Sequence, residues 1–176
     1  MKIVKCINSF FDRITHEIRL IKLKLAGITA LVFFILGILS WILGGRADRV
    51  AILFVFPRSA LPLGWAYTIW ALSFAFCGFV FAGILFGCEK YKRTLAQKSC
   101  IFIVLMFIFT LCAYPLFFGA LKPIFAFIAF LLSIIFCILA ILSCYRIYSL
   151  WTILLGVHFL WLLYNLIISL AFTFVN

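Results

Sequence analysis

Charged residues are scarce in this sequence, and acidic residues are the scarcest. Only 11% of the 176 residues are charged, with 4 Asp and Glu against 15 Lys and Arg. Soluble domains carry about 25% charged residues, so the surface of a soluble protein could not be covered here. Hydrophobic residues make up 69% of the chain instead. The composition excludes a soluble enzyme and predicts that lipid surrounds most of the protein.

Sequence motifs for catalysis and metal binding are also missing. The chain has no HExxH, GxSxG or P-loop pattern, and its 7 Cys and 2 His show no metal-ligand spacing. The acids Asp12, Glu17, Asp48 and Glu89 all lie outside the apolar runs, so no carboxylate is available within a bilayer for proton or ion coupling. We therefore predict no catalytic residue, no metal site and no disulfide. The basic residues only flank apolar runs, so no nucleic acid is expected as a partner.

Five apolar stretches without Asp, Glu, Lys or Arg are long enough to cross a bilayer, which takes about 20 residues. Backbone groups in lipid must be satisfied within their own segment, so these stretches are predicted to be helices. The expected fold is an all-α integral membrane bundle of five transmembrane helices. A long first loop, 46–63, is expected to carry its own apolar run. The predicted spans are 25–45, 64–87, 99–118, 123–143 and 150–175.

Basic residues are distributed unevenly between the two ends of these spans. With the N-terminus inside, the N-terminal arm, the second loop and the fourth loop hold 11 of the 15 basic residues. The outer segments hold the other 4: Arg46, Arg49, Arg58 and Lys122. Lys and Arg collect on the cytoplasmic side, so we expect a cytoplasmic N-terminus, an outer C-terminus and a plasma (inner) membrane location.

An amphipathic segment precedes the first span. Apolar residues recur every three or four positions over residues 1–24, with basic residues between them, which predicts a helix lying on the inner leaflet. A cleaved signal peptide is the competing interpretation. The retained helix is favoured because the charged arm is long and no small-x-small cleavage site follows the apolar run.

Aromatic residues are abundant, with 23 Phe, 6 Tyr and 5 Trp. Trp41, Trp65 and Trp151 fall near span ends, where an interfacial belt accounts for them. Trp70 and Trp161 lie roughly 9 Å and 16 Å into the second and fifth spans at 1.5 Å per residue. An indole N–H at that depth needs a partner, so these rings are expected to face protein or a ligand. Core packing is the alternative.

Small residues form a stripe in the second span at helical spacing: Ala71, Ala75, Gly78 and Ala82. Such a stripe lets two helices approach closely, either within one protomer or in a homodimer. His158 stands alone in the fifth span and has no nearby carboxylate in the sequence. It is interpreted as a packing residue, with a hydrogen bond to a ligand as the alternative.

Three short segments resemble the translocator protein family (TspO/MBR), also called the tryptophan-rich sensory proteins. The Pro-rich entry into the second span reads PLGWAYTIW (62–70), and the end of the third reads TLCAYPLFFG (110–119). The fifth span carries a deep Trp after a Leu-Leu pair, in LLGVHFLW (154–161). The family has Asn and Trp where this chain has Thr110 and Ala113. The resemblance covers residues 25–176 in architecture and only these three patches in sequence.

The resemblance implies a five-helix bundle with a pocket that opens toward the first loop. Family members bind porphyrins, haem-like tetrapyrroles, sterols and aromatic ligands there, and no cofactor is required. Trp70, Phe117, Phe118 and Trp161 match motif positions, and Pro62 and Trp65 match the lid. Independently of the resemblance, Tyr67, Thr68 or His158 is expected to offer a hydrogen bond to such a ligand.

The sequence therefore supports two competing hypotheses of function, from different classes. The leading hypothesis is a membrane binding protein, acting as a sensor or transporter, for a flat apolar ligand in an aromatic pocket. The alternative is a structural or accessory membrane protein that docks a partner subunit through the small stripe and binds no small molecule. Porphyrin degradation, proposed for some family members, is a weaker implication of the resemblance. A passive carrier would differ from the first only in a pocket that opens to both sides.

Overall fold

The computed structural model describes residues 2–19, 21–45, 55, 60–87, 92–145 and 147–175. These residues form six α-helices and one π turn, η2, with no strand among them. The elements in chain order are α1 (Lys2–Arg19), α2 (Leu23–Gly44), α4 (Leu63–Phe86), α5 (Arg93–Tyr114), η2 (Pro115–Gly119), α6 (Pro123–Tyr145) and α7 (Ser149–Val175). The predicted all-α fold is confirmed.

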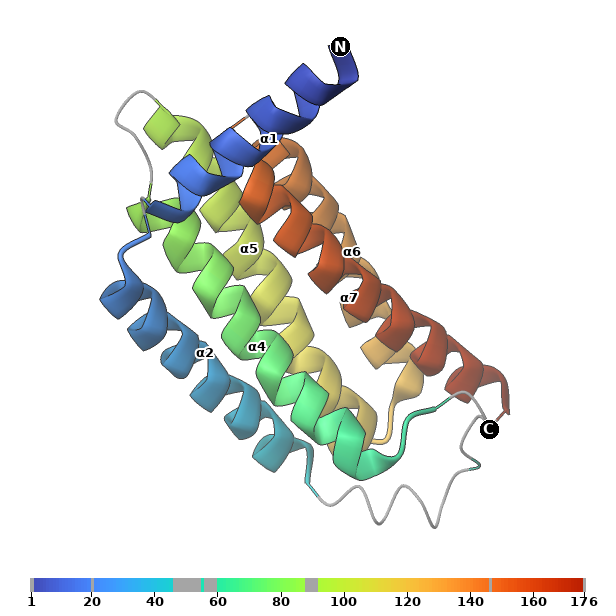
Figure 1. The fold of residues 1–176 in the computed structure, drawn as a ribbon. Helices are drawn as coiled ribbons and strands as arrows, with labels where there is room; N and C mark the ends of the chain where they lie inside the picture. Colours follow the sequence, from blue (N-terminus) through green and yellow to red (C-terminus); the bar gives the residue numbers. More distant parts are fainter. Residues whose placement is uncertain are drawn as a thin grey trace.

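Five of these helices, all but α1, are long and apolar enough to cross a membrane. They run alongside one another in a bundle, with α2 at its edge (Figure 1). α2 packs mainly on α4, whereas α5 packs mainly on α6, and α7 lies against α6 and α4. Many large apolar side chains face outward from these helices, as the lipid-exposed surface of a membrane protein requires.

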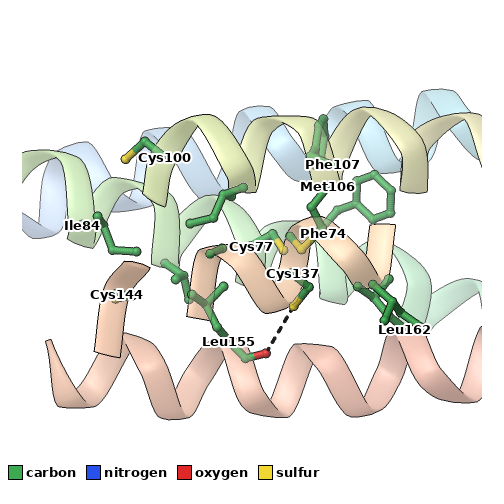
Figure 2. Close-up of a cluster of buried hydrophobic side chains, with 14 of the residues drawn as sticks. Phe74, Cys77, Ile84, Cys100, Met106, Phe107, Cys137, Cys144, Leu155 and Leu162 are labelled. Atoms are coloured by element: carbon green, nitrogen blue, oxygen red, sulfur yellow. Dashed lines mark hydrogen bonds between the residues drawn. The ribbon is translucent and has the colours of Figure 1, made fainter. Parts of the chain in front are cut away.

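The core of the bundle is built from α4, α5, α6 and α7. Phe74, Met106 and Leu155 from three different helices are among its fully buried side chains (Figure 2). Polar contacts add to this packing: the Cys137 thiol donates to the Leu155 carbonyl at 3.8 Å, and the Thr110 hydroxyl donates to Ser133 Oγ at 3.0 Å. Interhelical hydrogen bonds of this kind contribute to helix association in lipid.

The predicted N-terminal amphipathic helix is present as α1, which crosses one end of the bundle (Figure 1). It is held there by Glu17, which is 5% exposed. The Glu17 carboxylate accepts hydrogen bonds from the backbone N–H groups of Ser149 at 2.9 Å and Leu150 at 2.8 Å. These N–H groups begin α7 and have no acceptor within their own helix, so Glu17 acts as its cap from another helix.

Small residues of the second span, Gly78 of the stripe and the neighbouring Gly83, pack on two different helices. Gly78 packs on α2, since a Cβ at this position would lie 2.7 Å from the carbonyl oxygen of Thr29. Gly83, one turn further along, packs on α7, where a Cβ would lie within contact distance of Trp151. Gly78 and Ala82 are buried within the chain. The geometry therefore supports close approach within a protomer, and it leaves neither residue on a surface that a second copy could reach.

The long first loop lies mostly outside the described residues. Val55, from its predicted apolar run, is described and is 66% exposed. Residues 60–62 are also described and lead directly into α4, where Pro62 occupies the N-cap position. Proline fits there because the start of a helix does not need its backbone N–H. Of this described stretch, Ala60 and Leu61 reach the candidate site.

Candidate ligand-binding site

A cavity lies at the end of the bundle opposite α1, among the start of α4, the end of α5 with η2, α6 and the second half of α7. Its volume is about 70 Å³, or about 640 Å³ with the open space at its mouth included. Ala60 and Leu61 of the first loop lie along its edge. The other lining residues are Ala66, Tyr67, Trp70, Tyr114, Phe117, Phe118, Phe130, Trp161, Tyr164, Asn165, Ile168, Ser169 and Phe172.

The aromatic wall at η2 originates at Pro115. Proline has no backbone N–H, so it cannot bond to the carbonyl four residues earlier, that of Leu111. Ser40 of α2 satisfies that carbonyl instead, donating its hydroxyl at 2.7 Å. The chain then widens into a π turn that is closed by the Ala120 N–H donating to the Pro115 carbonyl at 2.9 Å. Widened turns of this kind occur frequently at functional sites.

The π turn places two consecutive aromatic rings on the cavity. The Phe118 ring centroid lies 4.4 Å from that of Tyr114, and the Phe117 centroid lies 4.7 Å from that of Phe172 on α7. Phe117 and Phe118 themselves are 4.7 Å apart. The result is a continuous aromatic surface that joins α5 to α7.

Trp70 and Trp161 stand on α4 and α7 and line the same cavity. Trp70 is 3% exposed, and its ring centroid lies 5.2 Å from Tyr114 and 6.0 Å from Phe130, the latter edge to face. Trp161 stacks on Tyr164 with centroids 5.4 Å apart and planes 22° apart. Both indole N–H groups are buried, and neither has a hydrogen-bond partner among the described residues.

Polar groups at the cavity come chiefly from α7. The Asn165 amide donates to the Trp161 carbonyl at 2.7 Å, and the Ser169 hydroxyl donates to the Leu166 carbonyl at 2.9 Å. At the edge, the Leu61 backbone N–H donates to the Tyr164 hydroxyl oxygen at 2.9 Å. The end of the first loop is thereby fastened to α7 directly over the cavity.

Five of the eight predicted site residues lie together. Tyr67, Trp70, Phe117, Phe118 and Trp161 all line the cavity, although they come from α4, η2 and α7. Each belongs to one of the three segments that carry the family resemblance. The bundle thus brings to one site residues as far apart in the sequence as Tyr67 and Trp161, which are separated by more than 90 positions.

The other three predicted residues lie elsewhere. Pro62 is exposed at the start of α4 next to the lining residue Leu61, and Trp65 is 66% exposed and points away from the core. His158 is buried at 4% exposure, among Phe74, Met106 and other core residues. None of the three lines the cavity, and the position of His158 agrees with its interpretation as a packing residue.

Several lining residues were not predicted. Asn165, Ile168, Ser169 and Phe172 follow Trp161 by 4, 7, 8 and 11 residues along α7. Such spacings keep side chains on one helix face, so extending the face of Trp161 would have identified them. Phe130 on α6 carries no comparable signal, because the whole of α6 is apolar.

The size of the cavity limits what it can hold in this conformation. Sites for drug-sized ligands occupy about 300–1,000 Å³, whereas the enclosed space here is about 70 Å³. A larger guest must therefore use the mouth of the cavity and displace the covering residues. Among the described residues that line the cavity, Tyr is the only acid or base, so these residues offer stacking, area burial and hydrogen bonding.

The fold and cavity define a multi-pass integral membrane protein with an aromatic-rich core. Comparisons with protein-family models, with curated proteins and with solved structures found no match.

Proposed function

We propose that this protein binds a flat, largely apolar small molecule in the aromatic cavity, of the class of a porphyrin, a haem-like tetrapyrrole or a sterol. The observation that carries the proposal is the pair of buried indole N–H groups at Trp70 and Trp161, which have no partner among the described residues. Leaving such a donor unsatisfied costs about 1–3 kcal/mol. A ligand with an oxygen or nitrogen acceptor recovers that cost while its rings or apolar faces pack on the aromatic wall.

The resemblance to the translocator protein family supports the same conclusion. Its three segments, 62–70, 110–119 and 154–161, each contribute a side chain to one cavity. The three segments lie on separate helices, and no local structure within any of them requires their side chains to meet at one cavity. Ligand binding gives a single reason for the convergence.

Entry of the ligand requires movement at the edge of the cavity. The Leu61–Tyr164 hydrogen bond closes the side of the cavity next to the first loop. A neutral hydrogen bond of this kind contributes about 0.5–1.5 kcal/mol net, which a ligand that buries a large apolar area can offset. The protein would then act as a sensor or a transporter, in which ligand occupancy and the position of residues 60–62 are linked.

Titration of protoporphyrin IX into the detergent-solubilised protein tests this proposal, with tryptophan quenching and porphyrin absorbance as readouts. We expect saturable binding to the wild type. Trp70→Phe and Trp161→Phe each remove one N–H donor and should weaken binding about 2- to 10-fold, the equivalent of one hydrogen bond. Trp65→Phe is the matched control, because its ring is exposed and lies outside the cavity.

Two results would contradict the proposal. One is the absence of saturable binding for protoporphyrin IX, haem and a sterol alike. The other is equal affinity in Trp65→Phe, Trp70→Phe and Trp161→Phe, since the cavity tryptophans would then make no specific contribution. The alternative of an accessory protein that docks a partner through the small stripe is less well supported, because α2 of the same chain covers Gly78.

A further inference from the structure

A second hollow, here called the lateral groove, lies between α4 and α5 near the end of the bundle that carries α1. Its volume is about 470 Å³, and it is open along one side. Its walls include Phe81 and Leu85 of α4 and Gln97, Ile101, Val104 and Leu105 of α5. The groove exists because α4 packs mainly on α2 and α5 mainly on α6, so these two consecutive helices contact each other over only a small area.

The depth of the lateral groove matches one leaflet of a bilayer. From Gln97 to Leu105 the α5 axis rises about 12 Å at 1.5 Å per residue. Half of the hydrocarbon core of a bilayer measures about 15 Å. Apart from Gln97 at the shallow end, the walls are apolar over this length, and Ile101 and Val104 are 58% and 38% exposed. The groove thus has the length and the chemistry to take an extended acyl chain.

Two cations on α5 lie within about one turn of groove residues, although neither lines the groove itself. Arg93 precedes Gln97 by four residues, and Lys98 precedes Ile101 by three, so both share a helix face with groove residues. Both side chains are exposed, and neither makes an ion pair within the part of the chain that the structure describes. Gln97 lies between them and adds an amide that can donate to or accept from a polar head group.

We propose that the lateral groove binds one anionic glycerophospholipid. Its acyl chain lies against Ile101, Val104 and the α4 wall. Its phosphate pairs with Arg93 and Lys98, and Gln97 bonds to the glycerol ester region. Basic sites between helices at a cytoplasmic surface suit anionic head groups, and the charge asymmetry of the sequence predicts that this end of the bundle is cytoplasmic.

Charge also argues against a second copy of the chain as the occupant. The protein has a net charge of +11 and only 4 acidic residues. Of these, Glu17 is already engaged at the start of α7. A second copy would therefore bring mainly like charge toward Arg93 and Lys98, whereas an anionic lipid brings the complementary charge.

Lipid retention measured by native mass spectrometry tests the proposal. The full chain is reconstituted in vesicles of phosphatidylcholine with phosphatidylglycerol, released into mild detergent, and its bound lipids are counted. We expect the wild type to retain one phosphatidylglycerol in preference to phosphatidylcholine. Arg93→Gln with Lys98→Gln should lower that preference about fivefold for each charge removed, at about 1 kcal/mol per basic residue. Lys22→Gln with Lys24→Gln is the matched control, because it removes two exposed charges near the same end of the bundle.

A second variant tests the acyl site separately from the charge. Val104→Phe fills the groove from a partly exposed position and should lower phosphatidylglycerol retention with both cations intact. If Val104→Phe lowers the thermal midpoint of unfolding, Ile101→Phe replaces it, because the Ile101 side chain is more exposed than that of Val104. Retention unchanged in both groove variants would overturn the proposal. An equal loss of phosphatidylglycerol retention in Arg93→Gln with Lys98→Gln and in Lys22→Gln with Lys24→Gln would also overturn it, because it would indicate general attraction to the surface. Recovery of the protein as a lipid-free dimer would overturn it as well.

Discussion

Gly78→Ala is expected to loosen the contact between α2 and α4. The added Cβ would lie 2.7 Å from the Thr29 carbonyl oxygen and 2.8 Å from the Phe33 Cβ, both on α2. Carbon–oxygen contacts normally measure about 3.3–3.6 Å. These atoms belong to the backbone or are fixed to it, so no side-chain rotation relieves the clash. α2 as a whole must move outward by roughly 0.6–0.9 Å to restore a normal distance.

The cost of this displacement can be estimated from overpacked cores, where an inserted methyl group destabilises by about 1–3 kcal/mol. For a chain of this length that corresponds to a fall of roughly 2–12 °C in the thermal midpoint, at about 2–4 °C per kcal/mol. The midpoint can be followed in detergent with a thiol-reactive fluorogenic dye. Cys77 and Cys137 are 2% and 0% exposed and become reactive only as the bundle opens.

Gly156→Ala is the control for this experiment. Gly156 lies in α7, and a Cβ at that position would meet no atom within 4 Å. Its thermal midpoint should match or exceed that of the wild type, because alanine favours the helix over glycine. If the two variants unfold at the same temperature, α2 is not seated on Gly78 and the packing argument is refuted.

Two further predictions concern hydrogen bonds between distant helices. Glu17→Gln keeps the size of the side chain but removes the negative charge that caps α7. Hydrogen bonds to a charged group contribute about 1.5–3 kcal/mol. Hydrogen exchange of the first two α7 amides should therefore accelerate about tenfold or more. Asp12→Asn, exposed on the same helix, should leave that exchange unchanged, and equal rates in both variants would argue against the cap. Ser40→Ala leaves the Leu111 carbonyl without its donor and should lower stability by about 0.6–1.7 kcal/mol in a detergent unfolding titration. Ser143→Ala, half-buried and bonded within its own helix, should change stability little. A loss as large as that of Ser40→Ala would contradict the role of Ser40.

Hydropathy alone predicts four of the five spans to within two residues at each end, because a bilayer requires long uncharged helices and allows few alternatives. The third span is the exception. It was predicted to begin at Ser99, whereas α5 begins at Arg93. The uncharged criterion excluded the first turns, which carry Arg93 and Lys98. Long basic side chains at a helix end can extend to the interface, so the helix continues through them.

Five of the nine aromatic residues that line the candidate site were predicted from the sequence, whereas its polar residues Asn165 and Ser169 were not. Trp70 and Trp161 stood out because an indole deep in a span needs a protein or ligand neighbour. Asn165 and Ser169 gave no such signal, since small polar residues often satisfy their own helix, as both do here. His158 was interpreted as a packing residue with a ligand contact as the alternative, and it lies among core residues because the cavity is confined to one end of the bundle.

The structure around Pro115 shows why a sequence motif can indicate where a site lies without indicating the geometry of that site. The residues PLFFG indicate a disturbed helix end, because proline removes one backbone hydrogen bond. They do not indicate how that loss is satisfied, since the donor, Ser40, lies 71 residues from Leu111 on the first span. In lipid a freed carbonyl must find a partner, and neighbouring helices commonly supply one. The same proline that opens the π turn at the cavity therefore also frees the carbonyl that Ser40 of α2 binds, so the shape of the cavity and one contact between α2 and α5 have a common origin.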